Sequence, residues 1–437
     1  MATLSTARLG SANTYDNAIR IVTARQAALS DLQENLTSGK RVVRASDDPT
    51  SAAIAERALT RISRIATDQR ALESQRTSIA TTESTLGDVT DALQRFRELV
   101  VSAGNGVHSA AERRTIAQEM QGLRDQVFAL ANTKDPNGLP LFNALGSALT
   151  PFVGPQATAP DYSFNGLPGQ TAAGTVSIPF TLDGDNAFMH QPARDQAFNA
   201  FVTNTVDGLI STGRTLTTDN VVVTNQATVS ATAAAAQAVA PPNNVPYPKY
   251  TVAFTAVDTT TVPGTTTATY TTTEVPPVSG VIAAVTISYP TDTSITVATL
   301  PGLSFNITGT PKVNDTITID SSASVFSVLD DAIRDIGEAS NNNASTQAVS
   351  QALHNIDIGL ARVSNVRGQA GELLNRADRI SGNQEKRSIQ MEENRSLAED
   401  LDMIKGISDF SNQQTGYSAA LQTYAQIQKL SLFNFIS

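Results

Sequence analysis

Histidines, clustered carboxylates and a glycine-containing segment are the parts of this chain whose residue types could support chemistry. The three histidines, His108, His190 and His354, lie far apart in the sequence, and none stands in an H-E-x-x-H arrangement that would hold zinc. The chain has no cysteine, which excludes zinc–thiolate sites, thiol nucleophiles and disulfide frameworks. These residues therefore predict neither a metal centre nor a nucleophilic site.

Two acidic pairs have plainer explanations than ligand binding. Asp183-Gly184-Asp185-Asn186 has the composition of a calcium loop but lacks its alternating spacing and distal Glu, so we expect a turn. Asp47 and Asp48 precede Pro49, an arrangement typical of a helix start. Gly166-Leu167-Pro168-Gly169 is not followed by the Lys-Ser/Thr of a phosphate-binding loop. We expect no enzyme activity, no cofactor and no metal.

Composition narrows the class of protein further. The formal net charge of −10 without a basic cluster argues against nucleic acid as a partner. The absence of Trp makes a large, dense single core unexpected. No stretch approaches the ~18–20 apolar residues of a membrane span, so we expect no membrane insertion. The first residues show no secretory signal.

One long helix, Pro49 to roughly Ala103, dominates the pattern. Asp48 can cap its first amides, and Gly104-Asn105-Gly106 supplies its end. At about 1.5 Å per residue it would be on the order of 80 Å long, so it needs partner helices. An apolar residue recurs every seventh position, the period of a coiled coil: Ile65, Leu72, Ile79, Leu86, Leu93 and Val100.

A second long helix is predicted towards the C-terminus, where Val349, Leu353, Ile356, Leu360 and Val363 alternate in spacing between four and three. Leu397 and Ile404 extend this apolar series, and Gly406 is expected to mark a joint. We expect the internal core of a helical bundle, rather than contacts between molecules, at seven positions: Leu72, Ile79, Leu86, Leu93, Leu353, Ile356 and Leu360.

The two ends of the chain carry shorter amphipathic helices, the first ending at Ser38-Gly39. Their apolar residues would be exposed in a lone molecule, so we expect them to contact neighbouring molecules. On the N-terminal helix these residues are Ile19, Val22, Leu29, Leu32 and Leu36; on the C-terminal helix they are Tyr417, Leu421, Tyr424, Leu432, Phe433 and Phe435.

Between the helical ends, residues 141–320 have a different character, with little charge and much Thr, Val, Pro, Gly and Ala. Tyr250–Phe254 and Asp315–Ile319 alternate apolar and polar residues with many β-branched side chains, as half-buried strands do. Thr259–Thr273 is low in complexity, and Thr228–Pro242 is rich in Ala. The sequence predicts a β-rich inserted domain with long loops between mainly α-helical termini.

Five segments together resemble the bacterial flagellins, and within them the hook-associated protein 3 branch. The first pairs Ser38-Gly39-Lys40-Arg41 with Ser46-Asp47-Asp48-Pro49, similar to that branch's "SGKR…SDDP" signature. Asn314 replaces the usual Gly of a "GTP…GD" stretch. The other segments are Leu93–Leu99, Asn132–Phe142, Gly309–Asp315 and Ala419–Phe435. The likeness covers roughly the first 145 and last 120 residues.

The resemblance implies a flagellum subunit of three parts: a terminal coiled-coil domain of residues 1–45 and 406–437, a long-helix bundle of 46–140 and 321–405, and the inserted domain of 141–320. It implies export without a cleaved signal peptide and an extracellular place in the flagellum. The implied partners are the other hook-associated protein, flagellin, further copies of the chain and an export chaperone.

The implied role is to join hook to filament. Two alternatives remain open at the level of sequence. One is a flagellin that forms the filament itself. The other is a flagellin-like surface protein whose Thr-rich insert binds a ligand such as a glycan.

Overall fold

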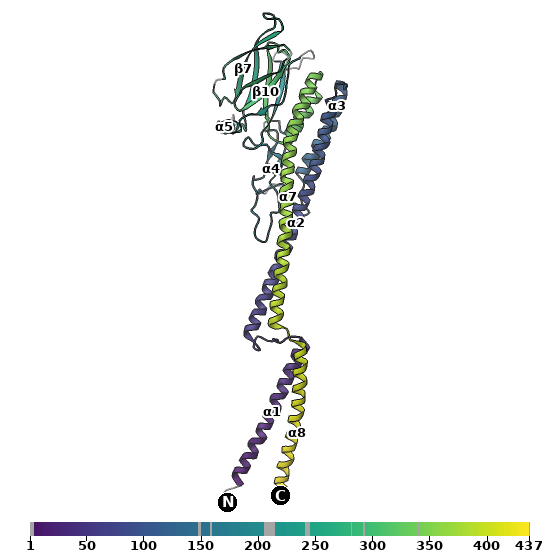
Figure 1. Ribbon diagram of the computed structural model, residues 1–437, viewed down its shortest axis with the longest axis vertical. Helices are drawn as coiled ribbons and strands as arrows, with labels where there is room; N and C mark the ends of the chain where they lie inside the picture. The colour runs from purple at the N-terminus through teal and green to yellow at the C-terminus, as the bar shows by residue number, and fades with distance from the viewer. Residues whose placement is uncertain are drawn as a thin grey trace. The chain divides into compact units, whose positions relative to one another are not determined.

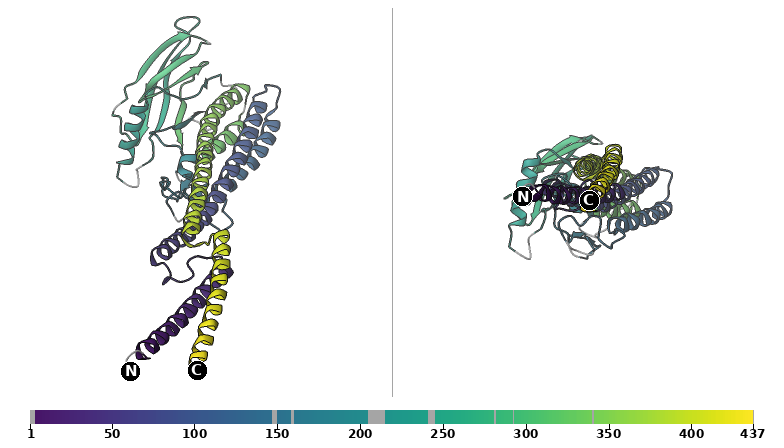
Figure 2. Two further views of the ribbon diagram at one scale, coloured as in Figure 1. Left: turned by 60° about the horizontal axis from the view of Figure 1, so that its bottom comes forward. Right: turned by 90° about the horizontal axis from the view of Figure 1, so that it is seen from below.

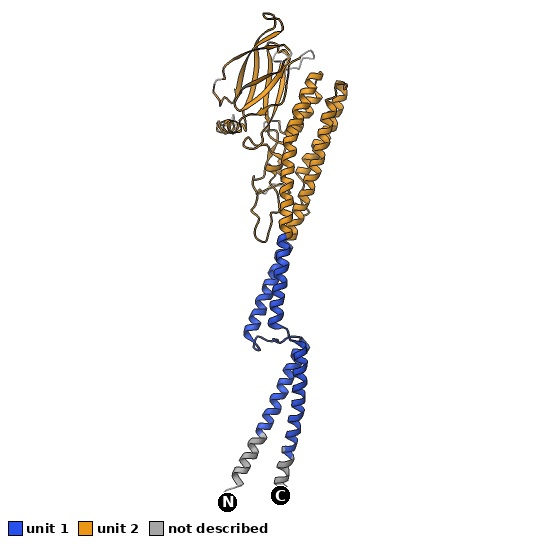
Figure 3. Cartoon of the chain, in the orientation of Figure 1, with its two compact units in different colours: residues 1–71, 379–437 blue, residues 72–378 orange. Residues whose placement is uncertain are grey.

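The computed structural model describes residues 4–146, 150–157, 160–204, 215–240, 245–280, 282–291, 293–339 and 341–436, without the side chains of 4–15, 204, 298–299, 427 and 429–436. It forms two compact units (Figure 3): unit 1 comprises residues 1–71 and 379–437, and unit 2 comprises residues 72–378. The boundaries between the units, at residues 71/72 and 378/379, fall inside the two longest helices of the chain. The three-part division expected from the sequence remains a prediction.

Unit 1 is built from helices contributed by both ends of the chain. Helix α1 (Leu4–Ser38) and helix α8 (Met403–Ile436) run antiparallel and pack against each other (Figure 1). The start of α2 (Pro49–Ala103) lies beside the end of α7 (Asn342–Glu399), with Arg61 Nη1 3.9 Å from Met391 Sδ. Gly39, directly after α1, has φ +69°, the left-handed conformation in which glycine commonly ends a helix.

The helical part of unit 2 joins α2 and α7 to two shorter helices, α3 (Ala110–Ala131) and α6 (Val325–Gly337), which pack against each other. Ser109 and Glu112 form the capping box at the start of α3, and Ser324 caps α6. Ion pairs link α2 to α7 along their length: Arg76–Asp378 at 3.2 Å, Glu83–Arg367 at 2.7 Å and Arg97–Asp357 at 2.9 Å.

Burial in the bundle follows the seven-residue repeat of α2. Leu72 is 3% exposed, and Ile79, Leu86 and Leu93 are completely buried. On α7, Ile356 is buried. Leu353 and Leu360, also expected in the core, are only half-buried. The α7 core is instead completed by neighbouring positions, among them Ala352, Val363 and Val366.

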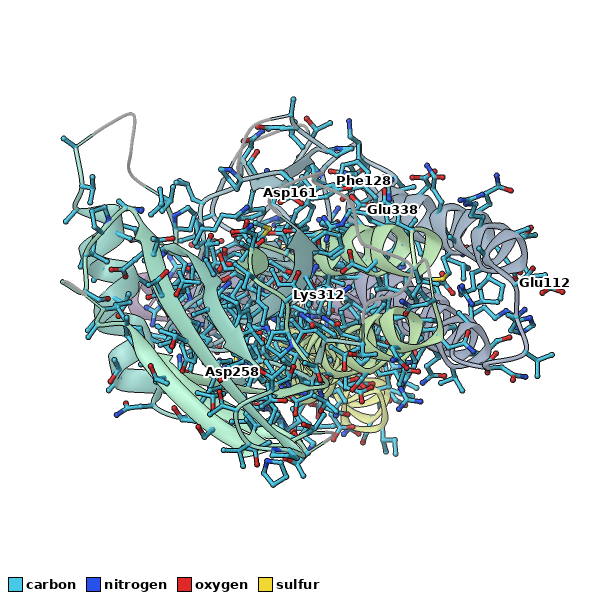
Figure 4. All side chains as sticks on the ribbon, turned by 90° about the horizontal axis from the view of Figure 1, so that it is seen from above. Glu112, Phe128, Asp161, Asp258, Lys312 and Glu338 are labelled. Carbon is cyan, nitrogen blue, oxygen red and sulfur yellow. The ribbon has the colours of Figure 1, made fainter. Side chains whose placement is uncertain are left out.

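The described residues between 132 and 196 are largely irregular and pack onto the helices. Strands β1 (Phe152–Val153) and β2 (Ser163–Phe164) and the short helix α4 (Gly184–Phe188) interrupt this segment. An aromatic cluster attaches it to α3 and α6: the ring of Phe326 lies 5.2 Å from those of Phe128 and Tyr162. Figure 4 labels Phe128 and Asp161 in this region. The first strand of the two larger sheets begins at Ala197.

Two antiparallel sheets form the insert (Figure 2). The five-stranded sheet has the order β3-β11-β6-β7-β8, and the four-stranded sheet the order β4-β10-β5 with β9 beside β10. Residues such as Tyr250, Phe254 and Phe305 fill the core of this domain. The strands are β3 (Ala197–Asn204), β4 (Thr217–Thr218), β5 (Val222–Val223), β6 (Lys249–Asp258), β7 (Thr265–Val275), β8 (Val285–Pro290), β9 (Ile295–Leu300), β10 (Leu303–Thr308) and β11 (Asp315–Ser322).

The two segments of biased composition in the insert largely form regular structure. The Thr-rich run contains β7, in which Thr266, Ala268 and Tyr270 point inwards and the intervening threonines outwards, because β-branched threonine suits a pleated sheet. The Ala-rich run overlaps helix α5 (Gln226–Gln237), which Asn225 caps. Alanine has the highest helix propensity, and Val229 anchors the helix in the core.

Amide side chains of α7 bind the insert to the bundle within unit 2. Gln351 Nε2 and Asn355 Nδ2 both donate to the carbonyl oxygen of Phe198 on β3, at 2.9 and 2.8 Å. Gln347 Nε2 donates to Ala200 O at 3.1 Å. Because these donors are held on a buried face of a helix, they fix the sheet against it.

Candidate assembly site

The two connections between the helices of unit 1 lie side by side and hydrogen-bond to each other. We call these connections, residues 39–48 and 398–402, the linker clasp. The amides of Arg41 and Val42 donate to Glu399 O at 2.7 and 3.3 Å, and the amide of Leu401 donates to Gly39 O at 2.9 Å. Lys40 and Asp400 form an antiparallel bridge between them. The N-terminal and C-terminal parts of the chain are thus joined by backbone pairing.

Arg41 is the side chain that holds the clasp together. Its guanidinium donates to Asp48 Oδ2 at 3.2 Å, to Ser51 Oγ at 3.1 Å and to Ala398 O at 2.8 Å. Lys40 adds an ion pair with Glu399, whose other oxygen accepts from Arg395 at 3.0 Å. One arginine therefore contacts the start of α2 and the end of α7 together.

The carboxylates of the clasp shape its turn. Asp48 Oδ1 accepts from Ser51 N at 3.1 Å and Thr50 Oγ1 at 2.7 Å. Hydrogen bonding by the side chains of Ser51 and Thr50, and then by the Ser51 amide, holds the pKa of Asp48 far below its usual range. Asp47 Oδ2 accepts from Arg44 N at 2.8 Å, the main reason that the pKa of Asp47 is also lowered. Two serines add shorter-range bonds: Ser46 Oγ donates to Asp47 at 3.3 Å, and Ser38 Oγ accepts from Lys40 N at 3.3 Å.

The α1–α8 pair has almost no buried core. Among the described side chains of the two helices, Gly406 is the single buried residue. Ile19 and Leu421 are 38% and 40% exposed. Leu432, Phe433 and Phe435 lie outside the described side chains. The remaining residues of the expected contact are half-buried: Val22, Leu29, Leu32, Leu36, Tyr417 and Tyr424. The pair leaves much of its apolar surface in water.

Comparison with known proteins bears on this arrangement. Residues 11–146 match the model of the bacterial flagellin N-terminal helical region. Residues 11–146 are therefore similar to the N-terminal helical region of bacterial flagellins. The matched region contains α1 from residue 11 onwards, the first half of the linker clasp, α2 and α3.

Individual relatives of the chain are flagellar proteins. Flagellar hook-associated protein 3 of Escherichia coli K12 is 32% identical over 195 residues, 44% of this chain and 57% of that protein. Flagellar filament core protein flaB2 of Brachyspira hyodysenteriae is 37% identical over 123 residues, 28% of this chain and 43% of that protein. The matched region therefore spans 57% of the first relative's length and 43% of the second's.

A solved structure supports the fold. The flagellar junction protein FlgL from Legionella pneumophila has a TM-score of 0.53 and 24% sequence identity, and the match covers 74% of this chain and 98% of that one. At this identity the likeness concerns the fold. It agrees with a flagellin-like arrangement of long helices from both ends of the chain.

In the C-terminal helices, Gly406 does not mark the joint that the sequence predicts. The break between α7 and α8 lies at Asp400–Asp402, because Asp402 Oδ1 accepts from the amides of Ile404 and Lys405 at 3.1 Å and so starts α8. Gly406 is inside α8, where a Cβ would stand 3.2 Å from Leu36 Cδ2. This glycine allows α1 and α8 to approach, and it does not form the joint.

Leu397 and Ile404 also differ from the expectation. Both were expected to continue the apolar series of α7, yet they are 76% and 86% exposed. The helix break between them ends the seven-residue register, so neither faces the bundle. They add to the exposed apolar surface beside the linker clasp.

The histidines and the calcium-like segment occupy structural positions. His190 Nδ1 lies 3.3 Å from Asp195 Oδ2, which also pairs with Arg362 at 3.0 Å. Asp183 caps α4 by accepting from the amides of Asp185 and Asn186, so this segment starts a short helix rather than forming a simple turn. Over the described ranges, no three His, Cys, Asp or Glu residues come together as a metal site would require. None of the described helices has the length and apolar character needed to cross a bilayer.

Proposed function

We propose that this chain is a non-enzymatic structural subunit of the bacterial flagellum that joins hook to filament. The flagellin N-terminal region supports a place in the flagellum. The match to hook-associated protein 3 extends over 195 residues, against 123 for the filament core protein, which favours the junction over the filament. The partners are then the other hook-associated protein on one side, flagellin on the other and copies of this chain within a ring or helix.

The observation that carries this proposal is the exposed apolar surface of the α1–α8 pair. Helices whose apolar faces stay half-exposed gain little stability alone. Packing against neighbouring subunits would bury Ile19 and Leu421 and offset the entropy of ordering the helices. Folding of the ends would then be coupled to assembly. Export of the unfolded chain without a cleaved signal, helped by a chaperone, fits this mechanism.

Hydrogen exchange tests the coupling. In the free monomer, the amides of residues 4–36 should exchange quickly, whereas those of buried α2 around Leu86 should be protected. The α2 amides are the internal control for the folded state. Strong protection of residues 4–36 in the monomer would contradict coupled folding.

Immunogold labelling tests the location. Antibody raised to residues 141–320 would be applied to native flagella of the source bacterium. A short labelled band at the boundary of hook and filament is expected. Label along the whole filament would instead establish the filament-forming alternative.

A further inference from the structure

An exposed leucine stands out near the end of α7 in unit 1. Leu397 is 76% exposed. Glu393, one helical turn before it, and Asp400, three residues after it, are both exposed. Leu397 with these two carboxylates, which we call the α7 knob, is an apolar side chain between negative charges.

A hollow of opposite character lies on the first turns of α2. Ala53, Glu56, Arg57, Thr60 and Arg61 line an open, shallow depression along one face of this helix. The small Ala53 side chain leaves the space, and the exposed Arg57 and Arg61 follow it at helical spacing. We call this the α2 hollow. Its two arginines outnumber its single carboxylate.

We propose that the α7 knob of one copy docks into the α2 hollow of the next copy. This inference rests on the proposed function and identifies the surfaces by which copies meet. Leu397 would cover Ala53, and Glu393 would face Arg57, so apolar contact and charge complementarity act together. Both surfaces belong to unit 1. Leu397 and Arg57 are exposed in the single chain and Ala53 is half-buried, so a second molecule can reach them.

The geometry of this contact has a consequence for assembly. The knob and the hollow are different surfaces of the same chain, so their contact is head-to-tail rather than two-fold symmetric. Contacts of this kind propagate from copy to copy and give a closed ring or an open helix. Either outcome suits a junction between two tubular parts.

The absence of native cysteine makes disulfide cross-linking a clean test. Cells of the source bacterium lacking their own copy would express two full-length single-cysteine chains, a tagged Leu397→Cys and an untagged Ala53→Cys. The matched control replaces Leu397→Cys with Ile389→Cys, which is 63% exposed and lies eight residues earlier on α7, about 12 Å along the axis. Flagella are isolated, oxidised and examined on non-reducing gels, with immunogold on the same samples.

The 397–53 pair should give about tenfold more tagged–untagged dimer than the 389–53 pair, since random collision has no preference for residue 397. Arg57→Glu should lower this yield, and Glu393→Arg in the tagged chain should restore it. A labelled band with equal yields from both pairs overturns the docking but leaves the junction role intact. If the 397–53 dimer is in excess but immunogold label covers the whole filament, the docking is supported and the junction role is overturned. If the labelled band and the excess of 397–53 dimer are both absent, the docking and the junction role are both overturned.

Discussion

The guanidinium of Arg25 on α1 lies over Gly416 on α8, with its Cζ 3.1 Å from the place where a Cβ on residue 416 would stand. Arg25 Nη1 also lies 3.5 Å from Gln413 Oε1. At this point a long polar side chain crosses a glycine, where an apolar contact would be expected of a coiled coil. The contact explains how two helices can lie together while burying so little apolar surface.

Gly416→Ala should stabilise α8 slightly. Alanine favours helix over glycine by about 1 kcal/mol, and the flexible end of Arg25 can swing aside. Gly406→Ala should lose that benefit, because its new Cβ would stand 2.9 Å from Leu401 Cδ2 and 3.2 Å from Leu36 Cδ2. Hydrogen exchange of the amides of residues 407–424 measures both. Equal slowing in the two variants would contradict the packing described at Gly406.

Arg41→Ala should loosen the linker clasp, since three hydrogen bonds that join α2 to the end of α7 are lost. A loss of about 1–2 kcal/mol is expected, and the amides of Arg41 and Leu401 should exchange roughly tenfold faster. Arg44→Ala is the matched control, because Arg44 makes one exposed ion pair, with Glu34. That change should cost no more than about 0.5 kcal/mol. Similar exchange in both variants would show that Arg41 does not hold the clasp.

Leu86→Ala should destabilise unit 2 far more than Leu353→Ala. Leu86 is fully buried, and its truncation should lower the free energy of unfolding by about 2–5 kcal/mol. Leu353 is half-buried, so a smaller transfer term is lost and solvent can fill the space. Urea unfolding followed by circular dichroism gives both values. Equal losses would mean that Leu353 is a core residue, as the sequence pattern predicts.

Asp331 should make the stability of unit 2 depend on pH. Burial raises the pKa of Asp331 to about 7, while the ion pair with Arg334 at 2.9 Å and the 24% of its side chain that is exposed moderate the rise. Because the folded-state pKa exceeds the unfolded value of 3.8, the stabilisation is complete below pH 3.8 and is lost as pH rises through about 7.

Asp331→Asn should therefore reduce the fall in urea midpoint between pH 5 and pH 8. Asp320→Asn, at a 54% exposed carboxylate on β11, is the control and should leave the fall unchanged. If Asp331→Asn leaves the fall as large as in the unaltered chain, another group is responsible for it.

Local sequence patterns predicted those features of the fold that depend on residues close together in the chain, namely helix ends and the buried face of α2. The repeat from Leu72 to Leu93 identified the buried face of α2, because helical periodicity alone sets which residues share a face. Gly39 and Asp48 marked the end of one helix and the start of the next for the same reason. The same pattern could not predict that Leu353 is only half-buried, because its burial depends on the orientation of α7 about its own axis relative to the helices that it contacts.

Contacts between distant residues were not predictable from the sequence. Arg41 binds the carbonyl of Ala398, 357 positions away, and nothing near Arg41 identifies that partner. The Thr-rich strand β7 was missed because low complexity obscured its alternation, which becomes clear only beside β6 and β8. The exposure of Leu397 was missed because the seven-residue spacing continues in the sequence after the packing has ended.

The linker clasp also has a mechanical consequence. A single covalent connection between the α1–α8 pair and the start of α2 would act as a swivel, about which either side could rotate. Two connections side by side, tied by the amides of Arg41 and Leu401, resist twisting about their common axis. A torque applied to the terminal helices is therefore passed on to α2 and α7 and is not dissipated at the linker.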